Sequence, residues 1–356
     1  MQPGFFRKQA KPLIGVDISA SAIKMLELGD SGGRMRIERH AVVPLPGDAV
    51  QEGRLARPDA VEAALRTTWR RLDGAPRDVA LALPAAAVIT RRLVLPVNCD
   101  EEWIEGWAVE EASRMVSFPV DEISLDFQVL GPTAQNPNEN DVLIVVTRRE
   151  RIDERLAVVA AAGLRAAVVE VEHHALLRAC AGQIDSLRES SRPIVALADI
   201  GSRITQVSFL SGDDLVYQCE QTFGSRDLTE EVARRFGWSL DAAETAGRRG
   251  GLPAEFAGEL LPAFLDAAAL EIGRALQMFF TATAHQHVDH ILVSGGAAAL
   301  PGLAEAIQGR TQTPTALADP FAGMQVSGRV DPGRFASDAA RLHVACGLAL
   351  RRFDPS

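Results

Sequence analysis

Two stretches of this chain repeat one pattern of strands and turns, and each carries an aspartate where its first strand enters a tight turn. The predicted strands lie at 14–19, 22–28 and 34–43 around Asp17 in the first copy, and at 195–201, 204–210 and 215–222 around Asp199 in the second. Such self-similarity predicts a duplicated fold. Two carboxylates on facing turns would also form a clamp for a metal-bound polyphosphate.

Composition excludes several classes of protein. At 356 residues, 47% of them apolar, the chain is long enough for two core-bearing units. The formal net charge of -10 gives no general attraction to a phosphate backbone, so we expect no nucleic acid partner. The four cysteines are scattered without a CxxC pair, which is typical of reduced thiols in the cytoplasm. No apolar run approaches the roughly 20 residues that span a bilayer, and residues 1–11 lack the apolar segment of a signal peptide, so we expect a cytoplasmic protein.

The chain between the two copies predicts a separate unit. Helical spacing over 58–72 is followed by a strand at 79–83, which completes the first core. The pattern then becomes strand 88–95, helix 100–116, strand 122–130, strand 141–147, helix 149–162 and strand 165–171. This β-α-β-β-α-β order is that of a split βαβ unit, so we interpret it as a subdomain inserted into the first core. After the second copy, 225–283 is predicted to be mostly helical, and a buried strand at 288–293 leads into a glycine turn and a closing helix at 339–351.

The turns after the two aspartates have the composition of phosphate sites. Strand ends of this kind point successive backbone N–H groups outward, and such nests bind phosphate oxygens without a cationic side chain. The residues at these positions are Ser19, Ala20 and Ser21 in the first copy and Gly201, Ser202 and Arg203 in the second. Mg²⁺ keeps several waters, so Asp17 and Asp199 need to reach it only through water. Lys24 could add a point charge at a β- or γ-phosphate.

Each aspartate alone has a simpler explanation, as a carboxylate that caps its own turn. The duplication favours the phosphate hypothesis, and so does a third glycine turn at Gly295, Gly296 and Ala297, which suits close approach by a ribose or an α-phosphate. Glu172, where the inserted unit rejoins the core, could orient an attacking water. The alternative is a glutamate that complements the dipole at a helix N-terminus. The acidic residues at 100–102 and 110–111 are interpreted as a solvated helix face.

In their order along the chain, these turns resemble the first phosphate, second phosphate and adenosine loops of the actin, Hsp70 and sugar kinase superfamily. Within it, the chain resembles the PilM family of actin-like proteins of type IV pilus assembly. The segments that carry the closer resemblance are Leu13 to Ser19, Ser117 to Glu122, Leu125 to Phe127, Leu228 to Glu231, Gly250 to Pro253, Ser294 to Ala297 and Ala345 to Leu350. The Phe118-Pro119 pair and the C-terminal Ala-Cys-Gly-Leu-Ala-Leu run are more specific than the phosphate turns, which identify only the superfamily.

The resemblance implies an α/β protein with an actin-like fold, that is, a duplicated ribonuclease H-like core with an inserted α+β subdomain. The implied domains are a first core over 1–87, completed by about 171–190 and the helix at 338–352; an inserted protein-interaction subdomain over 88–170; a second core over 191–224 and 286–337; and a helical subdomain over 225–285 above the adenosine.

The resemblance also implies ATP and Mg²⁺ in the cleft between the cores. The nucleotide-binding positions that it carries over are Gly15, Asp17, Ser19, Ala20, Ser21, Lys24, Asp199, Gly201, Ser202, Arg203, Gly224, Glu230, Gly295, Gly296 and Ala297. Asp17 and Asp199 would hold the metal through water, and Glu172 is the catalytic candidate. Two positions depart from the family pattern. Ala20 stands where a hydroxyl residue is usual, and Gly247, followed by Arg248 and Arg249, stands where a lysine often contacts the adenosine.

The expected function is that of a cytoplasmic ATP-binding scaffold of the pilus assembly platform, peripheral to the inner membrane through its partners. The implied partner is the N-terminal cytoplasmic peptide of PilN, with other inner-membrane assembly proteins and motor ATPases as further candidates. Hydrolysis is expected to be slow or absent, because spacing alone places no attacking water. Two alternatives stay open: a small-molecule kinase of the same superfamily, and a filament-forming protein related to the cell-division actin FtsA.

Overall fold

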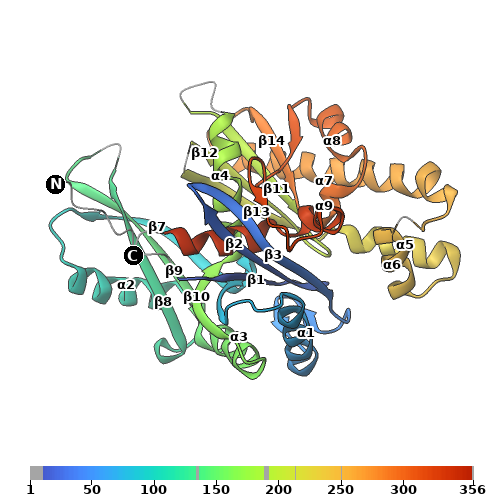
Figure 1. Ribbon diagram of the computed structural model, residues 1–356. Helices are drawn as coiled ribbons and strands as arrows, with labels where there is room; N and C mark the ends of the chain where they lie inside the picture. The colour runs from blue at the N-terminus through green and yellow to red at the C-terminus, as the bar shows by residue number, and fades with distance from the viewer. Residues whose placement is uncertain (1–10, 134–135, 188–191, 213, 250, 355–356) are drawn as a thin grey trace, which may run out of the picture.

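Two mixed β-sheets form the centre of the protein, whose computed structural model describes residues 11–133, 136–187, 192–212, 214–249 and 251–354 (Figure 1). The first sheet has the order β10-β6-β1-β2-β3-β16, with β1 (Ile14–Ile18), β2 (Ala22–Ser31), β3 (Arg34–Pro44), β6 (Asp78–Leu83), β10 (Arg165–Val171) and β16 (Gln325–Val326). The second has the order β13-β12-β11-β14-β15, with β11 (Ile194–Ile200), β12 (Thr205–Ser211), β13 (Asp214–Gln221), β14 (His290–Ser294) and β15 (Thr315–Leu317).

The two sheets contain the same hairpin in the same register, as the repeat predicted. Asp17 of β1 is paired with Lys24 of β2, and Asp199 of β11 is paired in the same position with Gln206 of β12. In each sheet the first strand of the hairpin also pairs in parallel with a later strand, β1 with β6 and β11 with β14. The duplication therefore extends beyond the turns to the order of the strands.

Two helices, α4 (Glu172–Ser186) and α10 (His343–Leu350), lie between the sheets and share one buried apolar cluster with strands of both. They approach each other so closely that a Cβ at Gly347 would lie 1.7 Å from the carbonyl oxygen of Ala175. A Cβ at Gly15 of β1 would lie 2.0 Å from the carbonyl oxygen of Ala345. Only glycine fits at either position, so these two residues determine how the closing helix packs between the halves.

Further helices pack on the first sheet or belong to the second half of the chain. Helices α1 (Pro58–Arg71) and α3 (Arg149–Ala161) pack on the first sheet beside the short strands β4 (Val50–Gln51) and β5 (Arg54–Leu55), and α5 (Ser225–Phe236), α6 (Leu240–Arg249), α7 (Leu261–Ala282) and α8 (Leu303–Thr311) belong to the second half. The predicted apolar face of α7 is buried, and the ring of its Phe279 stacks on Phe209 of β12 with centroids 4.3 Å apart. None of the helices in the described ranges is long and apolar enough to cross a membrane.

The inserted unit is smaller than its sequence pattern predicted. Its sheet has the order β7-β9-β8, with β7 (Val88–Pro96), β8 (Ile123–Pro132) and β9 (Glu139–Arg148), and α2 (Glu101–Met115) covers one face. The strand expected as its fourth, at 165–171, is β10 and pairs in parallel with β6 of the first sheet. Helix α3 likewise packs on the first core through Val158 and Val159. We therefore call residues 88–148 the inserted sheet; Figure 1 shows it at the end of the molecule opposite α5 and α6.

A late segment of the chain also crosses back to the first sheet. Strand β16 pairs in parallel with β3, with Gln325 opposite Arg36. Phe335 of α9 (Pro332–Asp338) lies in the buried cluster that contains Leu26 and Ile37 of the first sheet. The resemblance implied a second core over 286–337, whereas strand pairing and burial place this segment on the first sheet.

Candidate functional site

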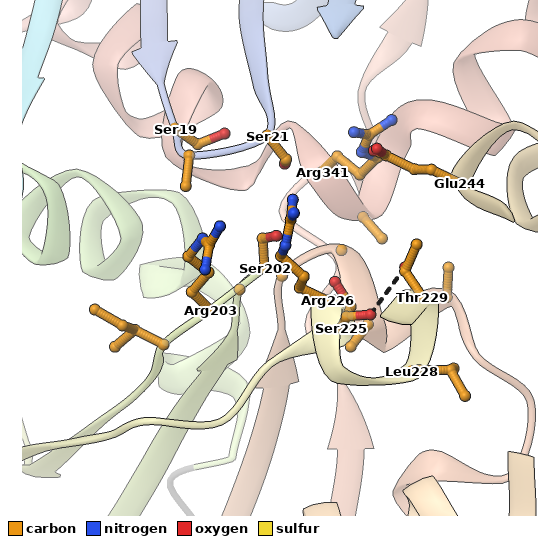
Figure 2. A pocket seen from close by; sticks show the side chains of 18 of the residues that line it. Ser19, Ser21, Ser202, Arg203, Ser225, Arg226, Leu228, Thr229, Glu244 and Arg341 are labelled. Atoms are coloured by element: carbon orange, nitrogen blue, oxygen red, sulfur yellow. Dashed lines mark hydrogen bonds between the residues drawn. The ribbon is translucent and has the colours of Figure 1, made fainter. Parts of the chain in front are cut away.

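A cavity of about 1260 Å³ lies between the two sheets, and both aspartate turns face it (Figure 2). Most of the residues predicted to bind nucleotide line this cavity. They are Asp17, Ser19, Ala20, Ser21, Lys24, Asp199, Gly201, Ser202, Arg203, Gly295, Gly296 and Ala297, and the catalytic candidate Glu172 lines it as well. The fold thus brings together around one space three turns that are far apart in the sequence.

The two turns present matched backbone donors. In each turn the first N–H group donates to the carbonyl oxygen three residues later, at 3.1 Å in the first copy and 3.0 Å in the second. The next two N–H groups, at Ala20 and Ser21 and at Ser202 and Arg203, donate to no other described residue. Consecutive unpaired N–H groups of this kind are what an anion nest requires.

Three carboxyl groups and a lysine meet in the cavity. Asp17 is buried, and its Oδ2 accepts a hydrogen bond from Nζ of Lys24 at 2.7 Å. Burial raises the pKa of Asp199, and Lys24 opposes that effect. Burial, together with the charges of Asp17 and Asp199, raises the pKa of Glu172 to about 8. Because the charge of Asp17 disfavours ionisation of both Asp199 and Glu172, an additional cation in the cavity would be stabilised. Among the described residues, no group of three or more His, Cys, Asp or Glu side chains is arranged to hold a metal ion by itself.

The glycine turn after β14 packs directly against the second copy. Gly295 has a φ of 89°, in the left-handed region that favours glycine. A Cβ at this position would lie 2.4 Å from the carbonyl oxygen of Ile200 and 2.6 Å from Oδ1 of Asp199. On the other side, Oγ of Ser294 hydrogen-bonds to Nδ1 of the buried His343 at 2.8 Å, and burial lowers the pKa of that imidazole to about 4. The turn is therefore fixed between β11 and α10.

Three of the predicted nucleotide-binding residues lie beside the cavity instead of lining it within the described ranges. Gly15 packs under α10, as described above. Gly224 precedes α5, where its N–H donates to Oδ2 of Asp227 at 3.2 Å. Glu230, one turn into α5, forms an ion pair with Arg226 at 2.7 Å. Their contacts in the structure are with other protein groups, so they support the walls of the cavity.

The sequence patterns did not indicate Arg226 and Arg341, which line the cavity with the predicted Arg203. Figure 2 shows Arg203 and Arg226 directed from the second half toward the turn that carries Ser19 and Ser21. Arg226 is the second residue of α5, so a basic residue two positions after Gly224 was the available signal. Arg341 lies in a short turn before α10, far along the chain from every predicted loop, and carries no local signal.

Both departures from the family pattern lie at the cavity. Ala20 occupies the first turn without a side-chain hydroxyl, and Gly247 of α6 lines the cavity without a side chain. The side chains of Arg248 and Arg249, considered as substitutes for a lysine, lie outside the described residues. Apolar side chains on α6 and after it, Leu240, Leu252 and Phe256, also line the cavity and offer a surface for a planar ring.

Comparison with known proteins identifies the family. The model of a family described as type IV pilus assembly protein PilM matches residues 15–353. Among solved structures, a chain of the PilM-PilN type IV pilus biogenesis complex is 27% identical with a TM-score of 0.80, and the match covers 97% of this chain and 100% of that chain.

Two more distant structures share the fold alone. The ethanolamine utilization protein EutJ from Carboxydothermus hydrogenoformans is 16% identical with a TM-score of 0.57, covering 96% of this chain and 89% of its own. A diol dehydratase-reactivating factor in nucleotide-free form is 10% identical with a TM-score of 0.50, covering 97% and 100%. With its duplicated core and the family match over nearly its whole length, the chain has the actin-like fold and belongs to the PilM family of type IV pilus assembly proteins.

Proposed function

We propose that the protein is an ATP-binding scaffold of the type IV pilus assembly platform that binds the N-terminal cytoplasmic peptide of PilN. The observation that carries nucleotide binding is the pair of turns in one register, whose four unpaired N–H groups lie around a single cavity. At about 1260 Å³ the cavity is large enough for a nucleotide.

The residues present fit ATP with Mg²⁺. The N–H groups of the two turns would bind phosphate oxygens, and Lys24, Arg203 and Arg226 would supply positive charge from both halves. Gly295 would permit close approach of the ribose or the α-phosphate, and the apolar side chains of α6 would cover the adenine. Mg²⁺ would offset the charge of the phosphates. Asp17 and Asp199 would reach it through water, with the phosphates and further waters completing its ligands.

We expect hydrolysis to be slow or absent. Glu172 would orient an attacking water, but burial raises its pKa, which disfavours the ionised form that a general base needs. A steady-state assay of phosphate release, with Glu172→Gln as the comparison, measures this directly. Fast turnover by the wild type would contradict the scaffold role of the nucleotide.

Titration calorimetry tests the nucleotide site. Asp17→Ala should weaken binding of ATP with Mg²⁺ by at least about tenfold, since its carboxylate lies in the cavity beside Lys24. Asp30→Ala is the matched control, because Asp30 holds the turn at the opposite end of β2, where its Oδ1 accepts from the N–H of Gly33 at 2.7 Å. Equal affinity of the wild type and Asp17→Ala would refute the assignment of the first turn.

The partner is inferred from the PilM-PilN complex, a chain of which matches over 97% of this chain and 100% of its own length. We place the peptide near the inserted sheet, where β7 and β8 are edge strands. An edge strand presents unpaired N–H and C=O groups, so an extended peptide can add to it as a further strand. Binding of this kind would hold the protein at the inner membrane through its partner.

Removal of the inserted sheet is a clean test, because its ends lie side by side. Val88 is paired with Thr147, and Oγ1 of Thr147 donates to the carbonyl of Ala87 at 2.6 Å. A short glycine linker can therefore join Ala87 to Arg149 without disturbing α3 or β10. The shortened protein should keep its ATP affinity and lose the PilN peptide in a pull-down. Retained peptide binding would place the interface elsewhere.

The two alternatives are not favoured. The family model and the similarity to the PilM-PilN complex support the scaffold rather than a small-molecule kinase or a filament-forming protein. Other assembly proteins and motor ATPases stay proposals as partners.

A further inference from the structure

The outer face of α2 is aromatic and exposed. Ile104, Ala108 and Ala112 face the inserted sheet and are buried. On the other side Trp103 is 50% exposed, and its ring stacks on that of Trp107 with centroids 6.5 Å apart and planes 9° from parallel. A large aromatic side chain that is exposed to solvent is typical of a binding site.

The inserted sheet as a whole concentrates exposed apolar side chains. Of the thirteen large apolar side chains that are exposed in the described ranges, eight belong to residues 88–148. They are Ile89, Val94, Val97, Trp103, Val109, Val120, Val129 and Leu130. Four of the eight lie on β7 and β8, and two, Trp103 and Val109, lie on α2. Because this unit is a small fraction of the chain, the bias indicates contact surfaces on it rather than the scattered exposure that every protein shows.

A glycine lies at the centre of the exposed helix face. At 100° per residue, Gly106 is opposite the buried stripe, with Trp103 on one side and Val109 on the other. A Cβ at Gly106 would meet nothing within 4 Å, so the fold of this chain does not require glycine there. Glycine weakens a helix relative to alanine. Gly106 therefore leaves a gap between two apolar side chains. It lowers the stability of the helix, and no contact within the described residues requires it.

The charges around this face select a basic partner. Glu101, Glu102 and Glu105 are exposed in the first turns of α2. The arginine near its end, Arg114, is engaged by Glu110 and Glu111. Carboxylates around an indole attract a cation, and an arginine or lysine side chain on the face of the ring gains a cation–π interaction. The same charges repel anionic surfaces such as lipid headgroups or nucleic acid.

We propose that the outer face of α2, centred on Gly106 and flanked by Trp103 and Val109, docks a basic segment of a partner protein. An arginine or lysine side chain of the partner lies on the indole of Trp103, and an apolar side chain fills the gap over Gly106. This face is separate from the edge strands β7 and β8 that were assigned above to the PilN peptide, and it does not depend on the nucleotide cleft.

Fluorescence anisotropy of a labelled peptide of alternating arginine and leucine, titrated with the full-length protein, tests the proposal. Gly106→Ala and Trp103→Ala should each weaken binding by at least about fivefold. Gly106→Ala should also keep or raise the thermal midpoint, because alanine favours the helix, so its loss of binding cannot result from unfolding. Gly182→Ala on α4, another exposed helical glycine with nothing within 4 Å, and Met278→Ala, 43% exposed on α7, are matched controls that should bind as the wild type does.

Several results would overturn the proposal. Unchanged affinity of Gly106→Ala would show that no partner side chain fills the gap over Gly106. Equal binding of a peptide with glutamate in place of arginine would show that the face does not select a basic partner. A dimer in sedimentation velocity that depends on Trp103 and forms without peptide would assign the face to a second copy of the chain. Tighter peptide binding after deletion of residues 1–10 would assign it to the chain's own segment with Arg7 and Lys8.

Discussion

Lys24→Met tests whether the charges of the cleft are balanced as the structure shows. The ammonium lies 2.7 Å from Oδ2 of Asp17, and the two side chains are only 14% and 5% exposed. At an effective dielectric constant of about 20, Coulomb's law gives roughly 6 kcal/mol for the attraction at this distance. Desolvation of the ammonium offsets part of that energy, so loss of this partner should cost about 3 kcal/mol of unfolding free energy. Lys24 also opposes the raised pKa values of Asp199 and Glu172, so its loss affects all three carboxyl groups.

Urea unfolding in EDTA measures this cost, and a double-mutant cycle isolates its origin. Adding Asp17→Asn to Lys24→Met should recover stability, because it removes the carboxylate that is left without a partner. Arg39→Met is the matched control, since Arg39 is equally exposed and pairs with the buried Glu27 of the same sheet. Both single variants should lose stability, but Mg²⁺ should restore only Lys24→Met. A Lys24→Met variant within about 0.5 kcal/mol of the wild type, or no recovery in the double variant, would refute the reasoning.

Three further predictions concern other parts of the fold. Burial raises the pKa of Glu172 in the folded protein to about 8 from an ordinary 4.5, so ionisation of this group should lower the free energy of unfolding as pH rises from 4.5 to about 8. Glu172→Gln should therefore raise the urea midpoint above about pH 8 and leave it unchanged below pH 4.5. Gly347→Ala should cost about 3 kcal/mol in the same assay, since its Cβ would lie 1.7 Å from the carbonyl oxygen of Ala175; a stable variant would contradict the packing of α10 on α4. Arg92 joins the inserted sheet to the second core through Asp214 at 2.6 Å, and because both side chains are about 40% exposed, a double-mutant cycle should give a coupling energy of about 0.5 kcal/mol that disappears in high salt.

Much of the site was predictable because it is encoded locally and twice. An aspartate, a turn and a returning strand have the same spacing in both copies, and the structure gives them the same register. The third turn was predictable for the same reason, because Gly295 and Gly296 directly follow a buried apolar strand. A local pattern of this kind determines its own backbone conformation, so the conformation expected from the sequence is also the one in the complete fold.

The predictions of domain boundaries failed where the place of a strand depends on pairing with residues far away in the sequence. The segment 165–171 has the pattern of any strand, and nothing in it distinguishes a place beside β9 from a place beside β6. The two residues of β16 join β3 across almost the whole chain, and so short a strand has no period to detect. Arg341 enters the cavity only because α10 is inserted between the two halves. Composition and periodicity predict the type of an element, whereas its neighbours depend on which buried faces meet.

The two copies share a backbone but not their charges, and this difference bears on how a ligand would lie. Asp17 faces Lys24 across its hairpin, whereas Asp199 faces the uncharged Gln206 in the same register. Two identical turns would bind a polyphosphate equally well in either direction. The cation on the first copy, and the packing of Gly295 against Asp199 on the second, make the two ends of the cleft different. The duplication therefore supplies the donors, and the divergence of the side chains after it gives the cleft a direction.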